Sequence, residues 1–223
     1  CGYKTDGIAQ LGEDLSGIPF FAGKTLRHGD RKYVNKNDDN VINEEDLFIL
    51  GNANPDFTFG FNNTFNFKLR NNSSLGLTVY LQGAVGNEIV NFNKFSLESF
   101  DGYKNNSTAA LNRWTPDNPT NLYPRATTKT AGNILSDHYV EDGSYLRIKD
   151  ITLSYTFPAN IIKKFYCEGL TIFAGLKNIH TFTDYSGYDP EVSRFANNNL
   201  SMGADYGSYP MSKSYEFGLR MNF

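Results

Sequence analysis

The stretch FTFGFNNTFNFKLR, residues 57–70, decides the fold class of this chain. Its even-numbered positions carry no large apolar side chain, and only Asn63 interrupts the apolar positions of the other parity. Those apolar positions are Phe57, Phe59, Phe61, Phe65, Phe67 and Leu69. Because successive side chains of a strand point to opposite faces, this pattern predicts one long strand with an apolar and a polar face. Its length exceeds the roughly five or six residues that are usual for strands of globular proteins, and it suits a strand that crosses a membrane.

Four further stretches continue this alternation. Polar residues at 71–74 predict a tight turn, and alternation resumes over 75–86 to complete a long hairpin. Later runs with the same period are expected at 145–157, 170–182 and 214–223. In the first of these, one extra residue near Lys149 and Asp150 would bring its two halves into phase, which predicts a β-bulge.

The connections between these runs alternate between short and long. Pro158 stops one strand, and 158–169 is expected to be a short connection with room for one helical turn. Long connections are expected at about 9–55, 87–144 and 183–213. Short turns on one side and long loops on the other are typical of outer-membrane barrels, in which the short turns are periplasmic. The predicted fold class is therefore all-β, an antiparallel transmembrane β-barrel to which this chain contributes its C-terminal strands.

Composition supports β structure and argues against several functions. The chain has 18 Phe, 14 Tyr and 20 Gly, and aromatic enrichment favours pleated surfaces. Its net charge of -3, without a basic stripe, argues against nucleic acid as a partner. No apolar run reaches the roughly 18 residues of a membrane-spanning helix. The three histidines, His28, His138 and His180, are scattered without ligand spacing, and lone loop histidines are usually solvated. We therefore expect no enzyme activity.

Six phrases in this order resemble the C-terminal region of SusC/RagA-like TonB-linked outer-membrane transporters. They are GYKTDGI (2–8), GDRKYV with NDDNVI (29–34 and 37–42), NPDFTFGF (54–61), RWTPDNP (113–119), DGSYLRIK (142–149) and YSGYDPEV (185–192). The resemblance extends over essentially the whole chain. It assigns residues 1–223 to the C-terminal part of the barrel domain, with the plug domain and the N-terminal strands expected upstream.

The resemblance implies a nutrient importer in the outer membrane of a Gram-negative bacterium. In this family a barrel of about 22 strands encloses a plug. Energy comes through TonB, which contacts the absent N-terminal part, and a SusD-like surface lipoprotein closes the outer mouth. The imported cargo is a glycan or a peptide. The partners implied for this chain are therefore the rest of its barrel and plug, the lipoprotein, membrane lipid and cargo.

The last residues also resemble an assembly signal of outer-membrane barrels. In such proteins a terminal aromatic residue on an alternating strand is recognised by the assembly machinery. The residues of this chain that carry the resemblance are Glu216, Gly218, Met221 and Phe223. The alternative is an amphipathic final strand that ends in Phe without such a role.

A calcium-type loop is the best candidate for a metal site. Oxygen-bearing side chains fall at the spacing of an EF-hand loop, and Val41 supplies a backbone carbonyl. The predicted ligands are Asn35, Asn37, Asp39, Val41 and Asp46. Three departures count against calcium: an uncharged first ligand, Asn40 in place of Gly, and Asp46 in place of a longer Glu. The alternative is a polar, turn-rich outer loop without metal.

Aromatic residues in the long loops are candidates for cargo binding. Aromatic faces beside Asn and Asp suit sugars or peptides, through stacking combined with hydrogen bonds. The residues singled out are Trp114, Tyr185, Tyr188, Tyr206 and Tyr209, with Tyr123 and Tyr139 as further loop aromatics. Alternatively, these rings pack the loops against one another.

Two other functions remain open from the sequence. A passive outer-membrane barrel or adhesin would show the same strands, and only a plug and a TonB-contacting segment upstream would distinguish the importer. A soluble β-sandwich that binds carbohydrate would instead bury the apolar face of 57–69 against a second sheet. The sequence does not name the cargo.

Overall fold

The computed structural model describes residues 1–100, 102, 104–128, 134–163, 166–192 and 202–223. The chain divides into two compact units. The sheet unit consists of residues 55–87, 143–185 and 209–223, and the loop unit of residues 1–54, 88–142 and 186–208. None of the described helices is long and apolar enough to cross a membrane.

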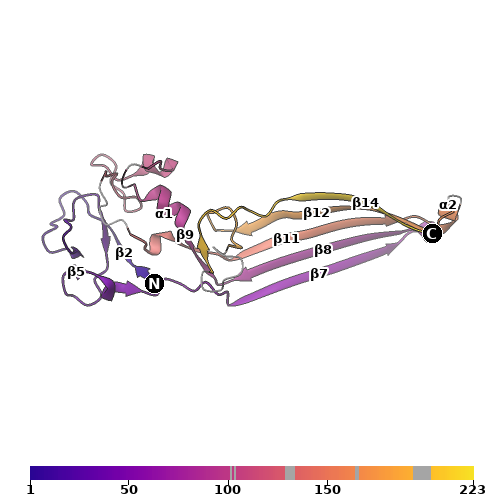
Figure 1. Ribbon diagram of the computed structural model, residues 1–223, viewed down its shortest axis with the longest axis horizontal. Helices are drawn as coiled ribbons and strands as arrows, with labels where there is room; N and C mark the ends of the chain where they lie inside the picture. The colour runs from indigo at the N-terminus through magenta and orange to yellow at the C-terminus, as the bar shows by residue number, and fades with distance from the viewer. Residues whose placement is uncertain (101, 103, 129–133, 164–165, 193–201) are drawn as a thin grey trace. The chain divides into compact units, whose positions relative to one another are not determined.

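The sheet unit is built on one five-stranded antiparallel sheet of order β14-β12-β11-β8-β7 (Figure 1). Each strand pairs with the strand before it along the chain, as successive long hairpins require. The strands are β7 Phe57–Lys68, β8 Ser74–Val85, β11 Tyr145–Thr156, β12 Gly169–Thr183 and β14 Ser214–Asn222. The short helix α2, Ala159–Ile162, lies in the connection between β11 and β12. The predicted strands and the helical turn after Pro158 are thereby confirmed.

The turn between β7 and β8 is as tight as the Asn-rich sequence predicts. A 3-10 turn, η2 (Arg70–Asn72), follows β7. Asn71 and Asn72 have φ angles of 62° and 61°, in the left-handed region that Asn tolerates better than most residues. The Leu69 N–H donates to the Ser73 carbonyl at 2.8 Å and closes the turn. The turn therefore fixes the register of the hairpin.

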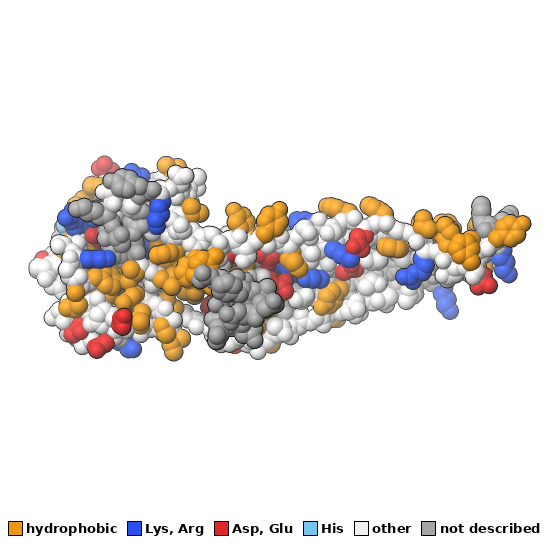
Figure 2. Space-filling view, viewed as in Figure 1, with side chains coloured by type: hydrophobic (Ala, Val, Ile, Leu, Met, Phe, Trp, Pro, Cys, Tyr) orange, Lys and Arg blue, Asp and Glu red, His pale blue; other side chains and the backbone are white. Residues whose placement is uncertain are grey.

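The sheet has the two chemically different faces that alternation predicts. Phe61 lies opposite Leu81 and Phe65 opposite Leu77, so apolar residues of neighbouring strands share one face. These side chains stay exposed: Phe61 is 57% and Phe65 48% accessible. Figure 2 shows hydrophobic side chains along the strands of this unit. Such exposure argues against the β-sandwich alternative, which needs this face buried.

A register shift interrupts β11 between Ile148 and Asp150. Relative to β8, Lys149 is the additional residue, as the parity change in the sequence predicts, and the bulge keeps the apolar residues on both sides of it on one face. The partners of Ile148 and Asp150 are Leu81 and Tyr80 in β8, and His180 and Lys177 in β12.

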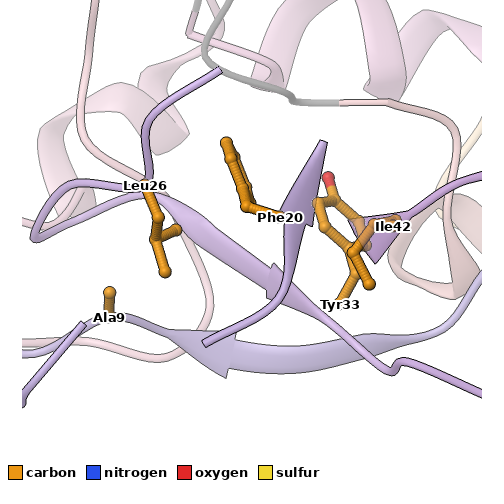
Figure 3. Packing of buried hydrophobic residues seen from close by; sticks show 5 residues of the cluster. All are labelled: Ala9, Phe20, Leu26, Tyr33 and Ile42. Atoms are coloured by element: carbon orange, nitrogen blue, oxygen red, sulfur yellow. The ribbon is translucent and has the colours of Figure 1, made fainter. Parts of the chain in front are cut away.

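The loop unit contains short strands and turns around a hydrophobic core of its own. Figure 3 shows five buried core residues, Ala9, Phe20, Leu26, Tyr33 and Ile42. Tyr3, Phe21 and Tyr33 add edge-to-face ring contacts, with centroids 5.4–6.0 Å apart. The described parts of the long connections that supply this core are therefore folded and do not merely link strands.

The elements of the loop unit are short. The paired strands include β9, which pairs with β10 and β13. The strands are β1 Gly2–Tyr3, β2 Thr5–Ile8, β3 Phe20–Phe21, β4 Arg31–Tyr33, β5 Val41–Ile42, β6 Leu47–Phe48, β9 Glu88–Asn91, β10 Val140–Asp142 and β13 Ala204–Asp205. The helix is α1 Phe92–Glu98, and the 3-10 turns are η1 Glu44–Asp46, η3 Thr108–Asn112 and η4 Asp137–Tyr139.

Gly83 of β8 should not tolerate a side chain. A Cβ atom there would lie 2.5 Å from Cζ of Phe59 and 2.6 Å from the backbone oxygen of Tyr145. We expect Gly83→Ala to lower the free energy of unfolding by about 1–3 kcal/mol, as overpacking does elsewhere. The control is Gly17→Ala, because a Cβ at Gly17 meets no atom within 4 Å. Equal denaturation midpoints for both purified variants would contradict this prediction.

Candidate functional site

Several loop aromatics predicted to contact cargo are buried. Trp114 is 6% and Tyr185 5% exposed, and Tyr139 has no exposed surface. Tyr123 is half-buried and packs against Phe100 and His138. A ring whose faces are covered cannot stack on a sugar or a peptide. Burial favours the packing alternative for Trp114 and Tyr185, and a ligand contact at either residue stays a prediction.

Trp114 joins two chain segments that lie far apart in the sequence. Its indole Nε1 donates to Oε1 of Gln10 at 2.9 Å. Its ring lies against Gly29, which has a φ of 88° and leaves no room for a Cβ atom. Gly29 is therefore required both by the backbone conformation and by the ring that covers it.

A charged pair ties the same two segments together. Nε of Arg125 lies 2.7 Å from Oδ1 of Asp30, whose other oxygen accepts the backbone N–H of Arg27 at 3.0 Å. Arg31 is buried and donates from Nη2 to the carbonyl of Leu122 at 2.9 Å. These contacts hold the loop unit in a defined conformation.

Three of the predicted aromatics remain accessible. Tyr188 is 74%, Tyr206 49% and Tyr209 92% exposed. Tyr206 already stacks on Phe92, with ring centroids 4.2 Å apart and planes 11° from parallel. Tyr188 borders a cleft of the loop unit. Because Tyr188 is both highly exposed and next to a cleft, it is the best candidate ligand contact among the predicted residues.

The cleft lies between α1 and the segment after β12. Its volume is about 320 Å³. Most of its lining residues have polar side chains, and Tyr188 is the one among them that the sequence analysis predicts as a ligand contact. The lining residues are Asn91, Asn93, Lys94, Leu97, Glu98, Ser186, Gly187 and Tyr188.

An ion pair and its hydrogen bonds form one wall of this cleft. Nζ of Lys94 lies 3.1 Å from Oε1 of Glu141. Glu141 also accepts from the N–H of Ser186 at 2.8 Å and from its hydroxyl at 2.9 Å, and Asn91 Nδ2 lies 3.4 Å away. Burial raises the pKa of Glu141, but the Ser186 hydrogen bonds and Lys94 outweigh it, so its pKa lies below the ordinary value. Glu141 therefore stays ionised at neutral pH.

Glu98 is the second carboxylate of the cleft, and burial raises its pKa above the ordinary value. Its Oε2 lies 4.0 Å from Nε2 of His138. Burial, with Arg31 and Lys94 nearby, lowers the pKa of His138 to about 3. The expectation of a solvated loop histidine is wrong for His138, because its ring packs against Tyr139 with centroids 4.8 Å apart.

The predicted calcium loop closes through its own hydrogen bonds at its C-terminal end. Both carboxylate oxygens of Asp46 accept backbone N–H groups, from Lys36 at 2.7 Å and from Asn43 at 2.8 Å. Asn43 in turn caps η1 by accepting the N–H of Glu45 at 2.7 Å. Asp46 is thus a capping residue that the loop needs with or without an ion.

The other predicted calcium ligands are also engaged within the loop. Asp39 accepts from the side-chain amides of Asn37 and Asn43 at 3.1 and 3.2 Å, and from the N–H of Val41 at 2.9 Å. Asn35 accepts the N–H of Asn37 at 3.3 Å. Over the described ranges, no group of three or more His, Cys, Asp or Glu is placed to hold a metal. Calcium binding stays a prediction.

Glu216, Gly218 and Met221 of the predicted assembly signal lie on the edge strand β14, and Phe223 follows it directly. Glu216 and Gly218 belong to the polar face, and Nζ of Lys177 lies 2.6 Å from Oε1 of Glu216. Met221 and Phe223 have the opposite parity and are 45% and 85% exposed. Recognition of this end by an assembly machinery stays a prediction.

Comparison with known proteins gives clear relatives. No protein-family model matches the chain. It is 32% identical over its whole length to TonB-dependent receptor P3 of Formosa agariphila. It is 33% identical over 87% of its length to TonB-dependent receptor P26 of the same organism, and 26% identical over 86% to TonB-dependent receptor SusC of Bacteroides thetaiotaomicron. The chain belongs to the SusC-like family of TonB-dependent receptors.

The match covers the chain but only part of these SusC-like relatives. The chain spans about a fifth of their length: 22% of receptor P3, 20% of receptor P26 and 17% of SusC. In fold, the chain resembles structures of the RagAB peptide importer in its closed-closed and open-open states, with TM-scores of 0.68 and 0.65. Each match covers all of this chain and 22% of the matched importer chain. At 22% identity this likeness concerns the fold alone, and it confirms the predicted all-β class.

Calcium should affect this SusC-like chain little. We expect chelator followed by excess calcium to shift the melting temperature of the full-length receptor by less than about 2 °C, because the loop closes without an ion. A large calcium-dependent rise that Asp39→Asn abolishes would contradict this. In that case the oxygen atoms of Asn37, Asp39, Val41 and Asp46 should lie about 2.3–2.6 Å from the ion.

Proposed function

We propose that this chain forms part of the barrel wall and outer loops of a TonB-dependent importer in the outer membrane of a Gram-negative bacterium. The observation that carries the proposal is the five-stranded sheet with one exposed apolar face in a chain of the SusC-like family. In this arrangement the sheet unit contacts lipid on its apolar face, and its polar face lines the interior. The polar face carries Lys177 and Glu216, whose charges lipid would not accommodate.

The proposed cargo is a glycan or a peptide, and the proposed lid is a SusD-like lipoprotein. The structural relative RagAB is named a peptide importer, which supports the peptide. Relatives are named receptors or importers, which supports transport over enzyme activity. The remaining partners that we propose are the rest of the barrel, a plug and TonB. The chain matches only about a fifth of its relatives, and in our proposal the remaining part of the receptor supplies the plug and the contact with TonB.

A passive barrel or adhesin is the alternative, and energy dependence separates the two. In cells that express the full-length receptor, uptake of a labelled oligopeptide mixture, and separately of labelled oligosaccharides, should stop when a protonophore is added or TonB is deleted. Uptake of either cargo that continues unchanged after both treatments would support the passive barrel.

The two faces of β7 provide a test of the lipid-facing wall. Phe61→Arg should reduce the amount of heat-modifiable receptor in outer-membrane fractions, because an arginine near mid-membrane on the lipid face costs about 2–4 kcal/mol. Asn62→Arg, the neighbouring position on the polar face, is the matched control and should assemble normally. Equal assembly of both variants would contradict the proposed orientation of the sheet.

Tyr188 provides a test of the cleft. We expect Tyr188→Ala to weaken binding of the transported cargo by about tenfold, which corresponds to one stacking contact of roughly 1.4 kcal/mol. Tyr166→Ala is the control, because Tyr166 is also highly exposed, at 94%, but lies in the connection between β11 and β12. Calorimetry on the purified receptor measures both. Unchanged affinity in Tyr188→Ala would exclude the cleft as a cargo contact.

A further inference from the structure

Glu141 contacts both sides of the cleft without lining it. One side is on α1 and includes Lys94, and the other is the segment after β12, which includes Ser186 and Tyr188. Glu141, on β10, does not belong to the lining as far as the chain is described, yet its carboxylate contacts Lys94 and Ser186. Any effect of Glu141 on a ligand of the cleft therefore passes through the residues that it holds.

Several donor groups converge on the Glu141 carboxylate. Its Oε2 accepts the backbone N–H of Ser186 at 2.8 Å. Its Oε1 accepts the Ser186 hydroxyl at 2.9 Å and lies 3.1 Å from Nζ of Lys94 and 3.4 Å from Nδ2 of Asn91. The Glu141 side chain is only 13% exposed, so salt and solvent screen these charge-assisted contacts little.

The arrangement of these donors requires an acceptor at both ends of the side chain. An ionised carboxylate only accepts, whereas a side-chain amide has one donor end. Whichever way an amide turned at this position, its NH2 group would face a donor, either the Ser186 N–H or the Lys94 ammonium. An ionised glutamate therefore fits this position better than a neutral side chain of the same shape.

Asn91 adds a second tie between the same elements. Its side-chain oxygen caps α1 by accepting the N–H of Lys94 at 2.9 Å, and its amide donates to Oγ of Ser186 at 3.3 Å. Asn91 is 3% exposed and ends β9, which pairs with β10 through Ile89 and Glu141. The N-terminus of α1, the β9–β10 pair and the segment after β12 thus meet at one carboxylate.

Tyr188 lies on the segment that Glu141 holds. Ser186, two positions before it, is bound to the carboxylate. Asp189, directly after it, is 6% exposed, and its Oδ1 accepts the N–H of Glu191 at 2.9 Å. The exposed ring of Tyr188 therefore stands on a backbone that is anchored on both sides, as a preorganised ligand contact requires.

We propose that Glu141 is the positioning residue of the cleft: its carboxylate clamps the segment 186–191 to α1 and so holds Tyr188 in place for cargo. Without this carboxylate, Ser186 loses two hydrogen bonds and Lys94 loses its counter-ion. The clamp itself rests on the geometry of the loop unit, whereas its role in cargo binding rests on the proposed function.

Hydrogen exchange of the purified full-length receptor without cargo tests the clamp. In Glu141→Ala, the backbone amides of residues 186–191 should exchange about tenfold faster than in the unmodified receptor. The amides of residues 20–42, in the core of the loop unit, should keep their rates, because a general loss of stability is not expected. Unchanged exchange at 186–191, or an equal acceleration at 20–42, would overturn the proposal.

Two variants control for charge and shape. Glu44→Ala removes an exposed carboxylate of the same unit and should leave exchange at 186–191 unchanged. Glu141→Gln keeps the shape of the side chain but turns an amide N–H toward donors, so exchange should rise, by less than in Glu141→Ala. A Glu141→Gln receptor that exchanges like the unmodified one would show that the carboxylate is not required and would contradict the clamp.

A double-mutant cycle connects the clamp to cargo. Uptake of a labelled oligopeptide mixture, and separately of labelled oligosaccharides, is compared in Glu141→Ala, Tyr188→Ala and the double variant at equal amounts of receptor in the outer membrane. If Glu141 acts through Tyr188, the double variant should transport no more slowly than Tyr188→Ala. Losses that multiply in the double variant would overturn the positioning role.

The two experiments separate the clamp from the proposed function. Normal uptake of both cargoes by Tyr188→Ala, with the expected exchange pattern in Glu141→Ala, would remove the cleft as a cargo contact. The role of Glu141 in cargo binding would fall with it, and the clamp would stand. The reverse result, slow uptake by Tyr188→Ala with unchanged exchange in Glu141→Ala, would remove the clamp and leave the cargo contact.

Discussion

The sheet unit depends on one constraint, the period of two that separates apolar from polar side chains. Antiparallel pairing preserves this separation only if the register of every hairpin is correct, since a slip by one residue exchanges the faces. The observed register places Phe61 opposite Leu81 and Thr64 opposite Thr78, whose hydroxyls lie 3.3 Å apart. Turn chemistry, the bulge and the glycine beneath Phe59 all act to maintain that register.

The loop unit is held by different forces. Its strands are two to four residues long and cannot be stable through pairing alone. A small aromatic core and a few buried polar contacts, such as Asp30 with Arg125 and Trp114 with Gln10, supply the rest. These contacts join segments about a hundred positions apart, so the loop unit requires the described parts of the connections 9–55 and 87–144 to fold together.

The sequence predicts the sheet well because alternation is a local property. The strand expected at 170–182 is found at Gly169–Thr183, and the parity change alone locates the bulge. The cleft could not be predicted in this way, because Glu141 meets Ser186 across 45 positions without any periodic signal. Trp114 and His138 mislead for a related reason: their polar neighbours suggest exposed loops, whereas long-range packing covers both rings.

The bulge has a geometric consequence for the three strands that meet there. Between the same two rungs of hydrogen bonds, β8 advances by one residue, β11 by two and β12 by three. Each step adds roughly 3.3 Å of chain, so β12 is longer than β8 by roughly 7 Å across this point. β8 and β12 differ by two residues, an even number, so the apolar side chains of both strands keep the same parity across this point. Only in β11 does the parity of the apolar side chains change. The sheet thus acquires a built-in shear at one position along its strands while its apolar and polar faces stay separate.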